Sequence, residues 1–261
     1  MARESLRQLL GMVKAEEKGD LASAFLTDLL YSIEYVEADP TYRPSKTYKP
    51  SSMGCIRGMY FMKTGAQPNL SGKKDAGMEG IMESGTDRHV RIQQAICNMK
   101  NRGIDCEYID VETFVNQRDI KGLKIISKQG METKCFYEPL ELSFMTDGII
   151  KYRGIYFVLE IKTEMSMKWN SRRGVEEKHR TQGCCYAYVF GIPRVMWLYE
   201  NRDICTKKTY VMEVTEEEIK ERVLDRIKLC NEYIEKKEVP PRPEHPRCDY
   251  CPYTEICRSG K

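Results

Sequence analysis

The sequence lacks several features that would assign it at once to a large class of proteins. It contains no run of about 18 apolar residues, the length that a membrane span requires. Residues 1–19 are charged and lack the apolar core and small-residue cleavage site of a secretory signal. No G-x-x-x-x-G-K-[ST] motif for nucleotide binding occurs. We therefore expect a protein without a membrane partner that stays in a reducing cytoplasm.

An excess of either charge is also missing. The 42 Lys and Arg residues nearly offset the 39 Asp and Glu residues, which leaves a net charge of +3. This balance does not establish a nucleic-acid partner, although it allows DNA binding through local basic patches. Charged residues at 31% and hydrophobic residues at 41% are ordinary for a globular protein and exclude wholesale disorder. We expect one large domain with a terminal extension.

Hydrophobic periodicity predicts an α/β fold, with a central mixed β-sheet flanked by helices. We predict helices at residues 5–36 with a break at Gly19, at 77–98, at 175–190, and from a Thr215/Glu218 capping box to about 237. Alternating runs predict strands at 108–114, 123–126, 140–145, 148–152, 155–161, 194–199 and 209–214. The helical N-terminal addition would cover residues 1–50, the main domain would cover 51–261, and a Cys-rich tail would end it.

Two acidic residues and one lysine meet near the end of the predicted sheet. Asp147 falls in a predicted turn, and Glu160 and Lys162 lie at the end of the apolar run 155–161. Residues two apart in a strand share a face, so Glu160 and Lys162 project together, within reach of Asp147 on the neighbouring strand. Such a motif is also typical of solvated strand ends. Here, however, the charges end a core strand, where they are costly unless used or paired, and Mg²⁺ and Mn²⁺ prefer carboxylate ligands.

Three further polar residues are candidates for the same site. Gln182 and Tyr186 are four residues apart on a predicted helix and therefore share a face. His89, one of three histidines, falls on the inner face of the helix predicted at 77–98. Taken singly, each is as easily explained as an ordinary core or surface residue.

The eleven cysteines cannot all pair, because their number is odd, and thiols stay reduced in the cytoplasm. Cys248, Cys251 and Cys257 lie close together in a short Pro-bounded tail that has no core of its own, and Cys55 follows a loop as the candidate fourth ligand. Three close thiolates and one remote thiolate are typical of iron-sulfur clusters, with zinc as the alternative. The other cysteines show no ligand spacing, and we expect them to pack as small hydrophobic residues: Cys97, Cys106, Cys135, Cys184, Cys185, Cys205 and Cys230.

Together, these motifs resemble the RecB-like branch of the PD-(D/E)XK nuclease superfamily, especially its CRISPR-associated and AddB-like exonucleases with an iron-sulfur cluster. The resemblance extends from about residue 55 to residue 257. It rests on G-x-x-x-H at 85–89, Asp147, E-x-K at 160–162, Q-x-x-x-Y at 182–186, and C-x-x-C-x-x-x-x-x-C at 248–257 with the remote Cys55. Thr146 stands where the superfamily name has Pro, a position that many members leave variable.

The resemblance implies a restriction-endonuclease-like core and a role for each residue of the site. One or two Mg²⁺ or Mn²⁺ ions would be bound by His89, Asp147, Glu160 and the main-chain carbonyl of Ile161. Lys162 would orient the attacking water and stabilise developing negative charge. Gln182 and Tyr186 would position the substrate strand and the lysine.

For the cysteines, the resemblance implies a 4Fe-4S cluster with a structural role. Cys55, Cys248, Cys251 and Cys257 would hold it and would close the domain by tying its beginning to the tail. Zinc remains the alternative occupant of this four-cysteine site.

The function implied is a metal-dependent DNA exonuclease that acts on single-stranded DNA or DNA ends. Its setting would be recombination, repair or replication in a prokaryotic or phage-infected cell, with a recombination or replication protein as a partner. The alternatives are a CRISPR spacer-processing nuclease, a structure-specific endonuclease, and a cluster-stabilised DNA-binding accessory protein without activity. The missing nucleotide-binding motif predicts a stand-alone nuclease and not a helicase–nuclease fusion.

Overall fold

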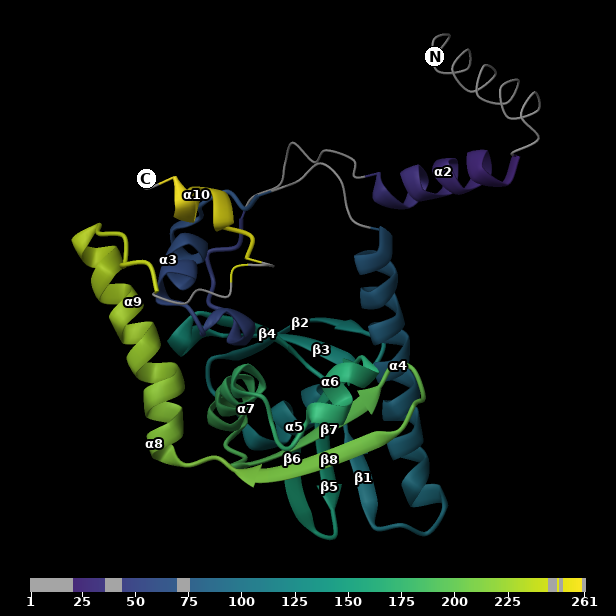
Figure 1. The fold of residues 1–261 in the computed structure, drawn as a ribbon. Helices are drawn as coiled ribbons and strands as arrows, with labels where there is room; N and C mark the ends of the chain where they lie inside the picture. The colour runs from purple at the N-terminus through teal and green to yellow at the C-terminus, as the bar shows by residue number, and fades with distance from the viewer. Residues whose placement is uncertain (1–20, 36–43, 70–75, 244–247, 249–250, 260–261) are drawn as a thin grey trace. The chain divides into compact units, whose positions relative to one another are not determined.

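Two β-sheets organise the chain in the computed structural model, which describes residues 21–35, 44–69, 76–243, 248 and 251–259 (Figure 1). A five-stranded sheet has the order β1-β5-β6-β7-β8, and a three-stranded sheet has the order β2-β3-β4. The strands of the larger sheet are β1 (Cys106–Ile109), β5 (Gly148–Tyr152), β6 (Ile155–Glu164), β7 (Arg194–Asn201) and β8 (Lys207–Glu213). The smaller sheet contains β2 (Leu123–Gln129), β3 (Glu132–Tyr137) and β4 (Leu142–Thr146).

The larger sheet is mixed, as predicted. β6 and β7 pair in parallel, whereas β1 with β5, β5 with β6, and β7 with β8 pair antiparallel. The predicted turn at 151–154 is the hairpin between β5 and β6. Helices flank the sheet, so the predicted α/β class is confirmed. The helices of the described residues are α2 (Leu21–Glu34), which belongs to a separate unit, and α3 (Ile56–Thr64), α4 (Ala76–Asn101), α5 (Val111–Arg118), α6 (Ser166–Ser171), α7 (Glu177–Phe190), α8 (Glu216–Ile219), α9 (Asp225–Lys236) and α10 (Thr254–Arg258).

The chain divides into two compact units, of which the second carries both sheets. The first unit takes its described residues from 1–42 and 70–84, and the second from 43–69 and 85–261. The predicted N-terminal helical segment is present as α2, but the part before residue 21 lies outside the described residues. The division into 1–50 and 51–261 stays a prediction. None of the described helices is long and apolar enough to cross a membrane.

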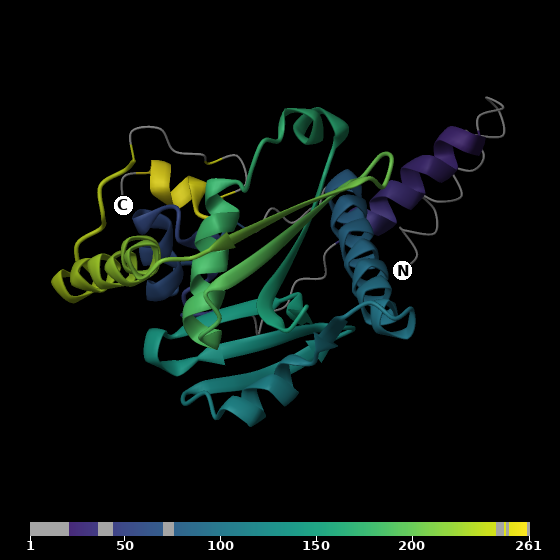
Figure 2. The same cartoon turned by 90° about the horizontal axis from the view of Figure 1, so that it is seen from below.

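The larger sheet is covered on both faces. Successive side chains of its central strand β6 point alternately into two hydrophobic cores, one on each face. Val158 points into the main core with α7, whereas Leu159 and Ile161 pack on the other face against Ile92 and Ile96 of α4. The ribbons of α7 and α4 lie on opposite sides of the sheet (Figures 1 and 2). Burying both faces of a central strand explains the nearly continuous apolar run of this segment. Each face of the sheet is thus covered by one helix that carries candidate site residues, α7 on one face and α4 on the other.

Helix α4 is also held to the sheet by charge. Glu200 of β7 is fully buried and accepts hydrogen bonds from Arg88 at 3.0 Å and Arg91 at 2.6 Å, and Lys207 lies 2.9 Å from its other oxygen. Buried carboxylates require such partners. Because Arg88 and Arg91 flank His89 in the sequence, this network fixes the helix turn from which His89 projects.

Helix α7 approaches β7 closely because it has a glycine at the crossing. A Cβ added to Gly183 would lie 2.4 Å from a ring carbon of the buried Trp197. We expect Gly183→Ala to destabilise the fold by about 1–3 kcal/mol in urea unfolding, since overpacking forces side chains or backbone to move. Gly80→Ala, in an open position of helix α4, should be neutral or slightly stabilising. Equal stability of the two variants would contradict this account of the crossing.

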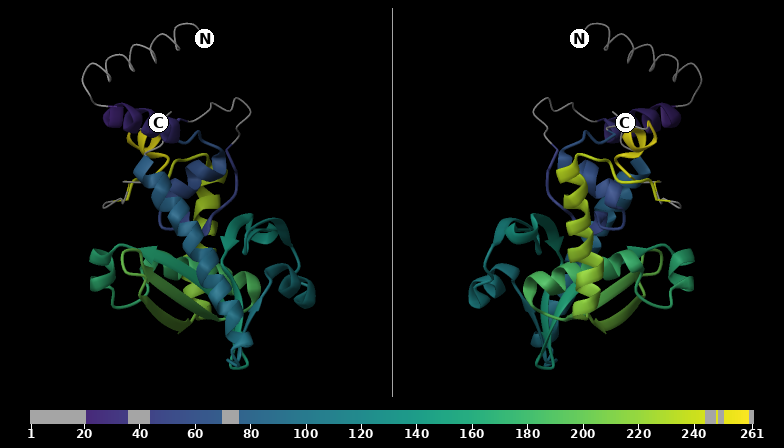
Figure 3. Two further views of the ribbon diagram at one scale, coloured as in Figure 1. Left: turned by 90° about the vertical axis from the view of Figure 1, so that its right-hand side faces the viewer. Right: turned by 90° about the vertical axis from the view of Figure 1, so that its left-hand side faces the viewer.

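The described C-terminal part returns to the beginning of the second unit. The Thr215/Glu218 capping box forms as predicted and starts α8, which continues through a π-helical turn (Lys220–Leu224) into α9. Helix α9 lies alongside α3 (Figure 3). Tyr253, just before α10, packs on Phe61 and Met62 of α3. This packing brings the tail next to the helix that begins after Cys55.

Several predicted elements were wrong or incomplete. The strand predicted at 108–114 ends at Ile109, and α5 follows it because Asp110 caps the helix by accepting the Thr113 N–H at 3.0 Å. Strand β3 and helix α6 were not predicted. The loop predicted at 40–52 contains a short 3₁₀ turn, η1 (Pro50–Ser52), and residues 36–43 lie outside the described part.

Candidate active site

A pocket of about 270 Å³ in the second unit gathers every residue of the predicted catalytic set. His89, Asp147, Glu160, Lys162, Gln182 and Tyr186 all line it. They come from α4, the β4–β5 junction, β6 and α7. The structure therefore brings together residues that are up to 97 positions apart in the chain, and it adds Glu132 and the η1 turn to the same walls.

Asp147 occupies the point where the chain leaves the smaller sheet and enters the larger one. In the β5–β6 register Gly148 pairs with Leu159, so one further step sets Asp147 opposite Glu160. In the β3–β4 register Thr133 pairs with Thr146, so the corresponding step sets it opposite Glu132. One carboxylate is thus faced by two others, from two different sheets.

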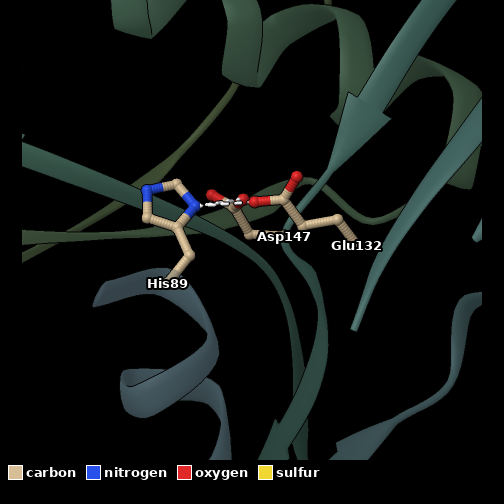
Figure 4. A group of neighbouring side chains, drawn as sticks. All are labelled: His89, Glu132 and Asp147. Carbon is tan, nitrogen blue, oxygen red and sulfur yellow. Dashed lines mark hydrogen bonds and ion pairs between the residues drawn. The ribbon is translucent and has the colours of Figure 1, made fainter. Parts of the chain in front are cut away.

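The Asp147 carboxylate is held by contacts with both of its oxygens. Oδ2 accepts the Ile161 N–H at 2.5 Å, and Oδ1 lies 3.0 Å from His89 Nδ1. The same imidazole nitrogen lies 2.9 Å from Glu132 Oε1 (Figure 4). Figure 4 shows the three side chains converging, with the ring of His89 pointing at the two carboxylates. Their ligand atoms all lie within 4.8 Å of one another.

This group is the candidate metal site, and its chemistry suits a hard divalent cation. The two carboxylates are oxygen donors of the kind that Mg²⁺ and Mn²⁺ prefer, and the imidazole adds a nitrogen donor that suits a transition-metal ion better than Mg²⁺. Burial would lower the pKa of His89, but its hydrogen bonds to Asp147 and Glu132 outweigh burial and raise it to about 10. The two carboxylates therefore favour a positive charge at this position.

Glu160 and Lys162 form an ion pair on the face of β6 that α7 covers, with Glu160 buried and Lys162 partly buried. Glu160 is only 2% exposed, and Lys162 Nζ contacts its Oε1. Burial raises the pKa of Glu160 to about 7, although Lys162 acts against it. Burial would lower the pKa of Lys162, but the carboxylates of Glu160 and Asp147 outweigh that effect and raise it. Lys162 thus keeps its positive charge inside the pocket.

A polar network behind Lys162 supports its strand. Tyr199 of β7 is paired with Lys162 in the parallel register, and its hydroxyl lies 2.9 Å from His179 Nδ1 of α7. The guanidinium of Arg172 stacks on the Tyr199 ring, 4.1 Å from its centroid, and forms a two-point ion pair with Glu164. Burial and the nearby Lys162 lower the pKa of His179 to about 3, so His179 is neutral.

The two candidate residues of α7 lie one helical turn apart, as their spacing predicts. The Tyr186 hydroxyl donates to the Met145 carbonyl at 3.1 Å, and its ring packs on Phe144 at 5.3 Å between centroids. Oε1 of Gln182 is buried and finds no hydrogen-bond partner among the described residues. Tyr186 therefore anchors α7 to the end of β4, whereas Gln182 has an acceptor left for another group in the pocket.

Glu132 is the functional candidate that the sequence interpretation missed. Strand β3, which carries Glu132, begins after a turn at Gly130, whose φ is +60°. The sequence signal for this strand is the short segment 132–137 that follows the turn glycine. Only the pairing with β4 places this carboxylate opposite Asp147.

The four cysteines predicted to hold a cluster, Cys55, Cys248, Cys251 and Cys257, are free thiols that are each partly exposed. Among the described residues, only the group around His89 brings three metal-binding atoms within 4.8 Å. Cys55 caps α3, and its Sγ accepts the Gly58 N–H at 3.4 Å. Arg57 donates to the carbonyl of Cys257 at 3.4 Å.

The other cysteines follow the prediction with two exceptions. The buried ones are Cys106, Cys135, Cys184, Cys185 and Cys230. Cys97 is partly exposed and Cys205 is exposed, because Cys205 lies in the turn between β7 and β8.

Comparison with known proteins gives one family match. Residues 138–258 match the model of the PD-(D/E)XK nuclease superfamily. No curated protein matches the sequence. Among solved structures, the crystal structure of SSO0001 has a TM-score of 0.45 and 16% identity, covering 99% of this chain and 98% of that one. The crystal structure of LHK-Exo in complex with dAMP has a TM-score of 0.43 and 12% identity, covering 74% of this chain and 89% of that one. Both structural likenesses are weak, so the similarity to the PD-(D/E)XK nuclease superfamily rests on residues 138–258, slightly less than half of the chain.

Proposed function

We propose that this protein is a Mg²⁺- or Mn²⁺-dependent deoxyribonuclease of the RecB-like branch, working as an exonuclease on single-stranded DNA or DNA ends. The observation that carries the proposal is the convergence of His89, Glu132, Asp147, Glu160 and Lys162 in one pocket. A cluster of acids alone is common, but here Glu160 pairs with a partly buried lysine, and Asp147, Glu160 and Lys162 lie in the segment 138–258 that matches a nuclease superfamily.

The metal site would use His89, Glu132 and Asp147, with Glu160 and the Ile161 carbonyl as further ligands. When bound, a divalent cation supplies positive charge next to the scissile phosphate and makes water more acidic. Asp147 is oriented for this by the Ile161 N–H, and His89 Nδ1 gives up its proton before the nitrogen can act as a ligand.

Lys162 would stabilise the negative charge that develops on the attacked phosphate and orient the attacking water. Its ammonium is held by Glu160 and is already desolvated, so little reorganisation is needed during the reaction. Gln182, with its unpaired Oε1, would position the substrate strand or the lysine, and Tyr186 would hold α7 in place beside them.

Digestion of end-labelled linear and closed circular single-stranded DNA, each with Mg²⁺ or Mn²⁺, tests this function. An exonuclease shortens the linear strand progressively from one end and leaves circles intact. Cutting of circles would assign the same site to an endonuclease, and a lack of cleavage with either metal would favour a DNA-binding accessory protein.

We also propose that Cys55, Cys248, Cys251 and Cys257 bind a 4Fe-4S cluster that ties the tail to α3. In the described part of the tail, the Cys251 N–H donates to the Cys248 carbonyl at 3.0 Å, and the single hydroxyl proton of Thr254 is shared between the carbonyls of Cys248 and Cys251. Arg57, two residues after Cys55, holds the Cys257 carbonyl and the Pro240 carbonyl.

We expect purified protein to be brown, to absorb visible light and to contain iron and sulfide. Cys251→Ser should lose most of the iron and colour, because a ligand is removed, whereas Cys205→Ser, at an exposed position outside this group, should keep both. A colourless protein that contains zinc would contradict the cluster and support the zinc alternative.

A further inference from the structure

The main-chain carbonyl of Asp147 accepts two side-chain hydrogen bonds from outside the predicted site. Gln93 Nε2 of α4 donates to it at 2.7 Å, and the Tyr108 hydroxyl of β1 donates to it at 2.8 Å. Because Asp147 lies between β4 and β5, it belongs to neither strand ladder, and side chains take over the role of a neighbouring strand.

Gly148 is required for one of these two contacts. Its φ of +138° is unfavourable for residues with a side chain. A Cβ at this position would also lie 2.5 Å from the Tyr108 hydroxyl oxygen. Any other residue would therefore push Tyr108 away from the Asp147 carbonyl.

The two donors also connect the other residues of the metal site. The Tyr108 hydroxyl lies 3.0 Å from the carbonyl of Met131, the residue before Glu132. Its single proton is thus shared between the segments that carry Asp147 and Glu132. Gln93 is one helical turn after His89 on α4, so both lie on the same helix face. This face contacts the side chain of Asp147 through His89 and the main-chain carbonyl of Asp147 through Gln93.

Gln93 lowers the free energy of unfolding at this buried position compared with an apolar side chain of similar size. It is 0% exposed, and its Oε1 has no hydrogen-bond partner among the described residues. A buried unsatisfied acceptor costs about 1–3 kcal/mol, so an apolar side chain of similar size would serve folding at least as well. The amide orientation is fixed, because the alternative would set Oε1 against the Asp147 carbonyl oxygen.

We propose that Gln93 and Tyr108 are positioning residues that fix the backbone of Asp147, and thereby aim its carboxylate at the cation shared with His89 and Glu132. The proposal rests on the proposed metal-dependent function. Outer partners of metal ligands typically change metal affinity by about 10- to 100-fold when they are removed. Removal of Gln93 should therefore weaken cation binding without lowering the stability of the fold.

The test measures Mn²⁺ affinity by electron paramagnetic resonance and stability by urea unfolding, both on the full chain. Gln93→Leu should weaken Mn²⁺ binding about 10-fold while its unfolding midpoint stays the same or rises, because the unpaired Oε1 is gone. Tyr108→Phe should weaken binding to a similar extent. The double variant should lose more than the product of the two single effects, because the Asp147 carbonyl then has no donor.

Two matched controls keep the test specific. Gln94→Leu changes the exposed neighbouring glutamine, and Tyr152→Phe removes a hydroxyl in the same apolar cluster; both should bind Mn²⁺ as the wild type does. Wild-type affinity in Gln93→Leu and Tyr108→Phe would overturn the positioning role while leaving the metal site intact. A wild-type protein that binds no Mn²⁺ would instead overturn the proposed function.

Discussion

Lys162→Met should reduce the single-turnover rate of DNA cleavage by about 100- to 1000-fold, the usual loss when a preorganised charge-stabilising group is removed. The ammonium is already desolvated and paired with Glu160, and Met preserves most of its length without its charge. Mn²⁺ affinity should change much less, since Lys162 is not among the proposed ligands. The rate is measured with end-labelled single-stranded DNA at saturating Mn²⁺.

The folded state of this variant can be checked independently. Loss of the lysine leaves Glu160 buried without its cation, but a carboxyl whose pKa is already about 7 can take up a proton instead. Circular dichroism should therefore show a folded protein. Lys121→Met, at an exposed turn position, serves as the control and should cleave normally. Full activity in Lys162→Met would remove the lysine from the mechanism.

Asp147→Asn should abolish both Mn²⁺ binding and cleavage. Its oxygen can still accept the Ile161 N–H, so the junction between the sheets should hold, but the negative charge that faces His89 disappears. The loss of affinity should exceed the roughly 10- to 100-fold typical of losing an outer partner of a ligand. Manganese titration followed by electron paramagnetic resonance measures it directly.

The control for this variant is Asp105→Asn, which makes the same substitution at an exposed position. It should bind Mn²⁺ and cleave DNA as the wild type does. If Asp147→Asn retained Mn²⁺ affinity, the cation would have to lie elsewhere, and the group formed by His89, Glu132 and Asp147 would be a structural ion-pair cluster.

The sequence singled out residues that line one pocket because their chemistry breaks a strong pattern. The apolar segment that ends in Glu160 and Lys162 indicates a core strand with charged residues at its end. The spacing of four residues correctly predicted that Gln182 and Tyr186 share a helix face, and both line the pocket. The same local logic failed at 108–114, where Val111, Phe114 and Val115 have helical spacing and Asp110 supplies the cap. The β-branched and aromatic residues of this segment predicted a strand, but the capping residue Asp110 starts a helix there instead.

Glu132 and Gln93 could not be identified in this way, because their roles arise from long-range pairing. Glu132 becomes a candidate ligand only through the register of β3 with β4. Gln93 looks like any polar residue of a charged helix until α4 packs on the sheet and buries it. Local pattern therefore finds residues that are unusual for their strand or helix, whereas residues made functional by packing require the tertiary structure.

The most direct test of metal-dependent cleavage at this pocket compares wild type and Asp147→Asn on linear single-stranded DNA, first in EDTA and then after Mn²⁺ is added back. We predict that the wild type is inactive in EDTA and recovers with Mn²⁺, while Asp147→Asn is inactive in both conditions. Cleavage that persists in EDTA, or that Asp147→Asn performs as well as the wild type, would contradict a metal-dependent active site centred on Asp147.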